Sequence, residues 1–208
     1  MSSLNTITIV VSNIKTADKY QARSYPHDDF DRNGKVELYE TPVYKVFIKS
    51  GDRVKEWKAL RFMPYWNNPS GPVAMYKTKG WVNSGLKSMP LRQVTYYNPS
   101  YGTHNRYSPY SGAIQIWNSF LIHAGPQNVY DLGWGAAGCV EIIGNFDEFK
   151  NDIKTLSGSS QRDSHQAILD LVAAGKLFVK VDYASPPNLK DGYYGEYDQT
   201  TGRIERRR

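Results

Sequence analysis

The sequence predicts a mostly β domain, a β-sandwich or a rolled sheet, with one or two helices near the C-terminus. Apolar and β-branched residues alternate through the first third, turn-forming residues dominate the middle, and helical spacing of apolar residues begins only after residue 144. A chain of 208 residues, 40% hydrophobic and 22% charged, is long enough for a single domain over residues 1–208. Its one cysteine excludes an internal disulfide and a cysteine-rich zinc site.

The first elements are expected to be strands. Residues 6–11 form a short β-branched run, and residues 36–50 carry alternating and β-branched side chains up to a Gly51-Asp52 turn. Residues 54–63 continue that pattern. Residues 1–63 are therefore predicted to be a β-rich N-terminal part of the domain.

The middle of the chain is expected to be loops with short strands between them, because residues 64–109 are rich in Pro, Gly, Asn, Ser and Tyr. Loops of this length commonly shape a binding cleft. Residues 113–123 are the clearest strand, and they place His123 at its end. A glycine-rich loop then leads into a second short strand at residues 139–143.

Two helices and a closing strand are expected after this point. Apolar residues recur at helical spacing behind Asn145, and again between Ser164 and Gly175. Residues 176–183 alternate as a closing strand. The tail, residues 185–208, is rich in Pro, Gly and Tyr and ends in three arginines, so we expect an extended arm or a disordered segment.

The charge of the chain indicates its classes of partner only broadly. Twenty-six Lys and Arg against twenty Asp and Glu give a formal charge of +6, which favours polyanions such as nucleic acid or anionic cell-envelope polymers. The basic residues are scattered and no nucleic-acid motif is present, so we expect no nucleic-acid partner. No stretch approaches the roughly 18 continuous apolar residues of a membrane span.

Cys139 is the first candidate for chemistry, since a thiol becomes a nucleophile where it is exposed and can be deprotonated. The preceding residues, Gly135-Ala-Ala-Gly138, lack large side chains, so a ligand can approach the backbone closely. The N–H groups of Gly138 and Cys139 could then form an oxyanion hole. His123, sixteen positions earlier, is a base that could lie beside the sulfur if the two strands are neighbours. The alternative is a buried, inert cysteine.

Residues 122–125 (IHAG) and 135–141 (GAAGCVE) resemble the catalytic signature of the L,D-transpeptidases. In that family His-Gly is followed, after a similar interval, by Ser/Thr-His-Gly-Cys-Ile-Arg. The resemblance extends over residues 111–183 and includes the final strand. The departures are Ala136, where the family has Ser or Thr, Ala137, where it often has His, and Glu141, where it has Arg. The reversed charge at Glu141 indicates an altered substrate or a divergent branch.

The resemblance implies cysteine-dependent acyl transfer on peptidoglycan stem peptides, with no cofactor for catalysis. Cys139 would attack the stem carbonyl, His123 would move the proton, and the Gly138 and Cys139 amides would hold the oxyanion. An amine acceptor gives L,D-transpeptidation or amino-acid exchange, whereas water gives L,D-carboxypeptidase trimming. Aromatic residues make up 13% of the chain and are suited to bind sugar rings or peptide stems. The candidate substrate-binding and cleft-wall residues are Trp117, Trp134, Tyr107, Glu141, His104, Tyr96 and Tyr97.

A separate pattern predicts a structural calcium loop. Residues 29–40 satisfy D-x-[DN]-x-[DN]-G-x5-E. The alternative is an Asn-Gly hairpin turn surrounded by solvated acids, because prolines flank the loop and a strand follows it. The candidate ligands are Asp29, Asp31, Asn33, Lys35 through its carbonyl, and Glu40.

Two other functions remain open from the sequence: a non-catalytic module that binds cell wall or glycan, and a Cys-His peptidase or amidase of another fold. No Sec signal precedes the apolar run at residues 7–11, because the first Lys or Arg is Lys15. Action in the periplasm or cell wall would then require a non-Sec route or a leader missing from this chain. One hypothesis is an antibacterial effector with a secretion or immunity partner.

Overall fold

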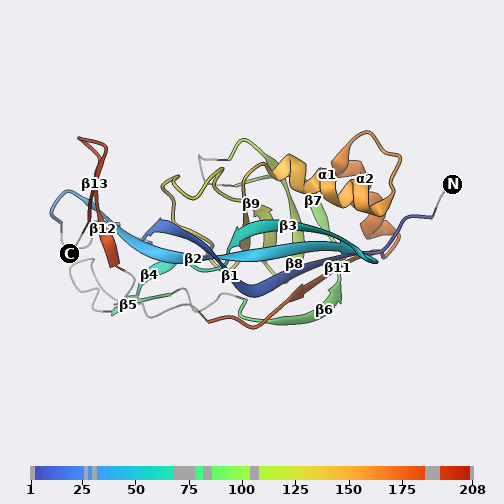
Figure 1. The fold of residues 1–208 in the computed structure, drawn as a ribbon, viewed down its shortest axis with the longest axis horizontal. Coiled ribbons are helices and arrows are strands. Elements are labelled where there is room, and N and C mark those ends of the chain that lie inside the picture. Colours follow the sequence, from blue (N-terminus) through green and yellow to red (C-terminus); the bar gives the residue numbers. More distant parts are fainter. Residues whose placement is uncertain are drawn as a thin grey trace.

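A computed structural model describes residues 3–25, 28–29, 32–67, 78–81, 86–103, 108–185 and 193–206. Of these residues 51% are in strands and 13% in helices, which confirms the mostly β prediction. Figure 1 shows α1 and α2 at one end of the long strands and the β12–β13 hairpin at the other. The strands are β1 (Ile7–Arg23), β2 (Val36–Ser50), β3 (Arg53–Leu60), β4 (Pro64–Asn67), β5 (Thr78–Trp81), β6 (Met89–Gln93), β7 (Tyr97–Gly102), β8 (Ser111–Trp117), β9 (Phe120–Ala124), β10 (Val140–Ile143), β11 (Leu177–Val181), β12 (Tyr193–Asp198) and β13 (Arg203–Arg206).

Most of these strands form one large mixed sheet that curls on itself. Its order is β6-β11-β1-β2-β3-β10-β9-β8-β7, with β12 and β13 attached to β2, while β4 and β5 pair separately. The two end strands, β6 and β7, are joined by residues 94–96, which can span only about 10 Å. The link is also hydrogen-bonded to strands near both ends of the sheet. Val94 N–H donates to the Leu177 carbonyl of β11, and the Tyr96 carbonyl accepts from Gln115 N–H of β8. The sheet is therefore rolled.

The central strands β1, β2 and β3 form where the sequence alternates. Ile7, Ile9 and Val11 are fully buried on one face of β1, and Val46 and Ile48 of β2 join them in the main core. The second half of β1 extends beyond the predicted segment. It is mostly polar, and two register irregularities interrupt its pairing with β2 between Val11 and Lys19.

Residues 113–123 do not form one strand, which corrects the sequence prediction. They form a hairpin in which β8 and β9 are antiparallel, with Ala113 opposite His123 and Trp117 opposite Phe120. The turn is at residues 118–119, where Asn118 adopts a positive φ of 47°. Asparagine tolerates this conformation better than most residues, so Asn118 is a turn signal. The apolar residues on both sides of it led to the prediction of one continuous strand.

The two predicted helices are present as α1 (Phe146–Ser157) and α2 (Ser164–Ala173). The Asn145 side chain caps α1 by accepting from the backbone amides of residues 147 and 148. Trp57 of β3 anchors α1, because its ring contacts Phe149 edge-on with centroids 5.6 Å apart and its Nε1 donates to Asp152 at 3.1 Å. The apolar faces of both helices pack into the main core.

A buried polar cluster joins the helices to the sheet. Lys150 of α1 has no exposed surface, and its Nζ donates to the Ser111 carbonyl at 2.9 Å and contacts His165 Nε2 at 3.0 Å and Asp147 at 2.7 Å. His165 Nδ1 contacts the Tyr97 hydroxyl at 2.6 Å. Burial, followed by the Lys150 charge, lowers the pKa of His165, which indicates a neutral ring.

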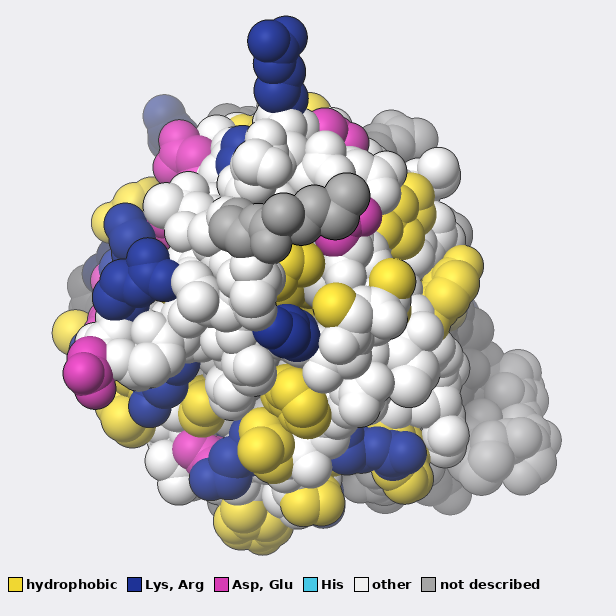
Figure 2. Space-filling model, turned by 90° about the vertical axis from the view of Figure 1, so that its right-hand side faces the viewer, with side chains coloured by type: hydrophobic (Ala, Val, Ile, Leu, Met, Phe, Trp, Pro, Cys, Tyr) yellow, Lys and Arg dark blue, Asp and Glu magenta, His cyan; other side chains and the backbone are white. Residues whose placement is uncertain are grey.

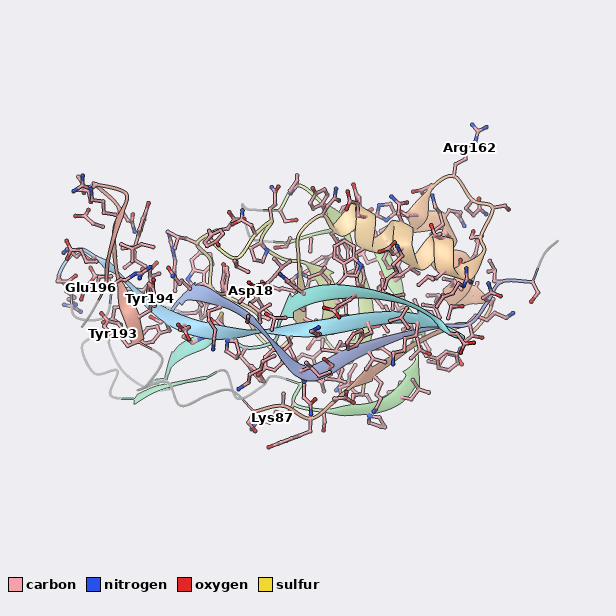
Figure 3. The ribbon with its side chains drawn as sticks, in the orientation of Figure 1. Asp18, Lys87, Arg162, Tyr193, Tyr194 and Glu196 are labelled. Atoms are coloured by element: carbon pink, nitrogen blue, oxygen red, sulfur yellow. The ribbon has the colours of Figure 1, made fainter. Side chains whose placement is uncertain are left out.

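The tail contains an ordered hairpin, β12–β13, rather than only an arm or disorder. β12 pairs with the first part of β2, placing Glu196 opposite Glu37 and Tyr193 opposite Tyr39. Tyr193, Tyr194 and Glu196 lie at this end of the molecule, far from Arg162 between the helices (Figure 3). The sequence shows no apolar alternation here because β13 is exposed throughout.

The surface agrees with the scattered charge of the sequence. On the face shown in Figure 2, Lys and Arg side chains are interspersed with hydrophobic and uncharged ones and form no single basic patch. Within the described part of the chain, neither helix has the length and apolar character needed to cross a membrane.

Candidate functional site

The pairing of β9 with β10 brings His123 and Cys139 to the same hollow. Strands β9 and β10 are parallel neighbours, with Ile122 opposite Val140 and His123 opposite Glu141. Cys139 immediately precedes Val140, so it lies at the start of β10 beside the β9 strand. Both residues line a hollow of about 380 Å³, together with Glu141 and Thr103. The sequence expectation that the two strands are neighbours is therefore confirmed.

The backbone orients the His123 ring. Its side chain is 5% exposed, and Nδ1 lies 2.8 Å from the Ala124 carbonyl. A carbonyl only accepts, so Nδ1 carries the hydrogen and the lone pair is on Nε2. The Tyr101 ring packs against the imidazole, with centroids 5.4 Å apart and the planes inclined by 50°. Nε2 is thus the nitrogen that can take a proton.

Cys139 is a half-buried thiol whose surroundings favour the protonated form. Burial raises the pKa of the Cys139 thiol, a hydrogen bond from the Leu121 backbone amide lowers it, and the nearby Glu141 carboxylate raises it. The net direction is upward. A nucleophilic Cys139 would therefore need a base to remove its proton during the reaction, rather than a preformed thiolate.

Glu141 is the buried acid of the site. It is 8% exposed, and its Oε2 atom makes no hydrogen bond to any residue that the structure describes. Burial raises the pKa of the Glu141 carboxyl to about 8, from an ordinary value of 4.5. The carboxyl is therefore mostly neutral at pH 7.

The glycine-rich loop lies close against other backbone segments. Gly135 has a φ of +77°, and a Cβ there would be 2.6 Å from the Phe62 carbonyl oxygen. Gly138 has a φ of +96° directly before Cys139. Ala136 is fully buried and its amide donates to the Phe62 carbonyl at 3.3 Å, whereas Ala137 lines the hollow. These contacts explain why the loop uses small residues.

The structure divides the aromatic residues predicted to bind substrate. Trp134 lines the hollow. Trp117 does not, because the β8–β9 reversal places it in a second hollow of about 270 Å³, where Arg92 lies over its ring at 3.8 Å. Tyr97 is buried against α2 through His165 and is no cleft wall, while Tyr96 is 53% exposed outside the hollow. His104 and Tyr107 lie outside the described residues.

Sequence reasoning missed four residues that line the hollow: Tyr25, Met63, Tyr101 and Thr103. Tyr25 and Met63 come from segments that precede the motif by many residues, and no local pattern marks them. Tyr101 lies in the tyrosine-rich stretch at the end of β7, where the aromatic content gave a general signal. Its placement beside His123 depends on the strand order β9-β8-β7.

The predicted calcium loop has hydrogen bonds of its own. Asp29 accepts from the backbone amides of Asn33 and Gly34, each at 3.0 Å. Glu40 lies in β2 and pairs with Lys19 of β1 at 3.3 Å. Lys35 forms an ion pair with Glu205. Asp31 lies outside the described residues, and no group of three acidic, His or Cys side chains gathers within the rest.

Comparisons of the chain with protein-family models, with curated proteins and with solved structures find no significant match.

Proposed function

We propose that the protein is a cysteine-dependent acyl transferase that acts on peptidoglycan stem peptides, as an L,D-transpeptidase, exchange enzyme or L,D-carboxypeptidase. The observation that carries the proposal is the parallel pairing of β9 with β10, which brings His123 and Cys139 to one open hollow. The resemblance of residues 111–183 to the L,D-transpeptidase signature supplies the substrate class.

In this reaction Nε2 of His123 takes the thiol proton of Cys139 as the sulfur attacks the stem carbonyl. A C–S bond forms, and the carbonyl oxygen becomes an oxyanion held by the amides of Gly138 and Cys139. Collapse of this intermediate breaks the C–N bond, and the leaving D-amino acid takes the proton back from the imidazolium. The product of this half-reaction is a thioester on Cys139.

An amine or water then attacks the thioester and gives its proton to His123. Collapse breaks the C–S bond, and the thiolate recovers the proton. The raised pKa of Cys139 fits this order, because a neutral thiol needs its base in the same step. The hydrogen bond to Ala124 keeps the imidazole oriented through both halves.

The decisive experiment incubates purified muropeptides with the wild type and with Cys139→Ala, and reads the products by mass spectrometry. The proposal predicts loss or replacement of one terminal D-amino acid from tetrapeptide stems, absent in the variant. Cleavage at another bond would indicate a peptidase or amidase. Binding to the wall without any product would indicate a non-catalytic module.

The substrate places the proposed site of action in the periplasm or cell wall. Expression in a bacterium, with and without an added signal peptide, examines this point and the hypothesis of an antibacterial effector. Growth inhibition only with the signal peptide supports both, and a Cys139→Ala control shows that the effect depends on the thiol. Equal growth in both cases opposes them.

A further inference from the structure

The described walls of the hollow are acidic and aromatic. Glu141 is the only carboxyl side chain among them, and no Lys or Arg belongs to the described lining. The aromatic rings of Tyr25, Tyr101 and Trp134 also line the hollow. Such walls offer a carboxylate ligand only a histidine and neutral hydroxyl donors, with no Lys or Arg, whereas their carboxyl and aromatic rings suit a cation.

The Glu141 carboxyl lacks the partners that a buried carboxyl normally has. Glu141 lines the hollow with 8% of the residue exposed, and its buried Oε2 accepts no hydrogen bond within the described residues. A buried polar group without a partner is costly, so such groups in folded proteins commonly serve a function. The other two buried glutamates, Glu37 and Glu196, each accept a hydrogen bond from a tyrosine hydroxyl.

A primary ammonium group would satisfy this site. It offers three N–H donors and a positive charge to the carboxylate, and the faces of nearby aromatic rings attract it further. Trp134 already attracts a cation, because the Arg23 guanidinium lies 5.7 Å from its ring centroid. That guanidinium is paired with Asp28 at 3.4 Å and is no part of the hollow's described lining.

We propose that the hollow recognises its substrate through a primary ammonium group held by the Glu141 carboxylate. This inference rests on the proposed function, because the bound molecule is a substrate only if acyl transfer occurs. The binding itself does not require catalysis. Glu141 is opposite His123 in the β9–β10 register, so the ammonium group would lie next to the reacting carbonyl. Glu141 is thus a specificity-determining residue.

The raised pKa of Glu141 supports this assignment. A carboxyl with a pKa of about 8 is mostly protonated at pH 7, and an ammonium ligand beside it would favour the ionised form. Binding of the cation should therefore release a proton from Glu141 into the buffer. An uncharged ligand of the same shape should release none.

The experiment uses Cys139→Ala protein, in which no acyl transfer can occur, and two matched probes. Nα-acetyl-lysine amide carries a primary ammonium, and Nα,Nε-diacetyl-lysine amide lacks it. Calorimetry at pH 7 should show at least tenfold tighter binding of the first probe, with proton release detected from buffers of different ionisation enthalpy. The difference between the probes should disappear in the double variant with Glu141→Gln.

Equal binding of the two probes, or a preference that persists in Glu141→Gln, would overturn the inference. The probe comparison and the proton release need no change at Glu141, so together they test the recognition of an ammonium group by a protonated carboxyl even if that variant does not fold. The result is also separable from the proposed function. Ammonium binding without turnover of muropeptides refutes acyl transfer but supports the recognition, whereas turnover with no preference for the ammonium probe refutes the recognition alone.

Discussion

Replacing Glu141 by Gln should change how the stability of the protein depends on pH. Glutamine keeps the shape of the side chain but cannot ionise. The folded-state pKa of Glu141 is about 8, against an ordinary value of 4.5, because burial disfavours its charge. Because folding raises the pKa of this carboxyl, the contribution of Glu141 to the free energy of unfolding is fully present below pH 4.5 and is lost as the pH rises toward 8.

The magnitude follows from the pKa difference. Each pKa unit corresponds to about 1.4 kcal/mol, so the rise from pH 5 to pH 8 should lower the free energy of unfolding of the wild type, relative to Glu141→Gln, by at most about 4 kcal/mol. Urea denaturation at several pH values, followed by tryptophan fluorescence, measures this difference. Parallel pH profiles for the two proteins would refute the reasoning.

Glu196→Gln is the matched control. Glu196 is also 8% exposed, but its carboxylate accepts a hydrogen bond from the Tyr193 hydroxyl at 3.1 Å (Figure 3 labels both). It lies on β12, away from the hollow. The comparison therefore separates the effect of an unpartnered buried carboxyl from that of any buried carboxyl.

Three further outcomes are expected. Lys150→Met should lower the free energy of unfolding by about 2 kcal/mol, because its buried acceptors lose their donor, and a change below about 0.5 kcal/mol in urea titrations would contradict this. Gly135→Ala should lower the free energy of unfolding by about 2 kcal/mol or more, because its Cβ would meet the Phe62 carbonyl. Gly51→Ala, also at positive φ but with open space around it, should lower stability less in thermal melts, and equal losses would oppose the argument. Millimolar calcium should raise the melting temperature of the wild type and not of Asp29→Asn, and an unchanged wild-type value removes the predicted calcium loop.

Strong local signals made much of the fold predictable. β2 matches the predicted segment from Val36 to Ser50, because its β-branched run is long and bounded by a turn. Both helices begin near the predicted positions, where the Asn145 and Asp163 side chains accept hydrogen bonds from the first free amides. The β8–β9 reversal was missed because apolar alternation continues across Asn118, and only tertiary pairing selects a turn there.

The neighbouring strands of His123 and Cys139 were predictable, but the walls of the hollow were not. The Gly-Cys pair and the distant histidine can be recognised in the sequence. Whether their strands pair could be checked only in the structure, which shows parallel pairing. Tyr101 and Met63 join the hollow through the strand order β3-β10-β9-β8-β7, which no local pattern predicts. Trp117 was assigned to the wrong hollow, since its position depends on the hairpin that the sequence concealed.

The most direct test of the central claim is intact-protein mass spectrometry of the protein mixed briefly with a tetrapeptide stem. We predict an added mass equal to the stem without its terminal D-amino acid, carried by Cys139 as a thioester that hydroxylamine removes. The adduct should be absent in Cys139→Ala and strongly reduced in His123→Ala. An adduct that survives in Cys139→Ala, or product formation by that variant, would contradict the account.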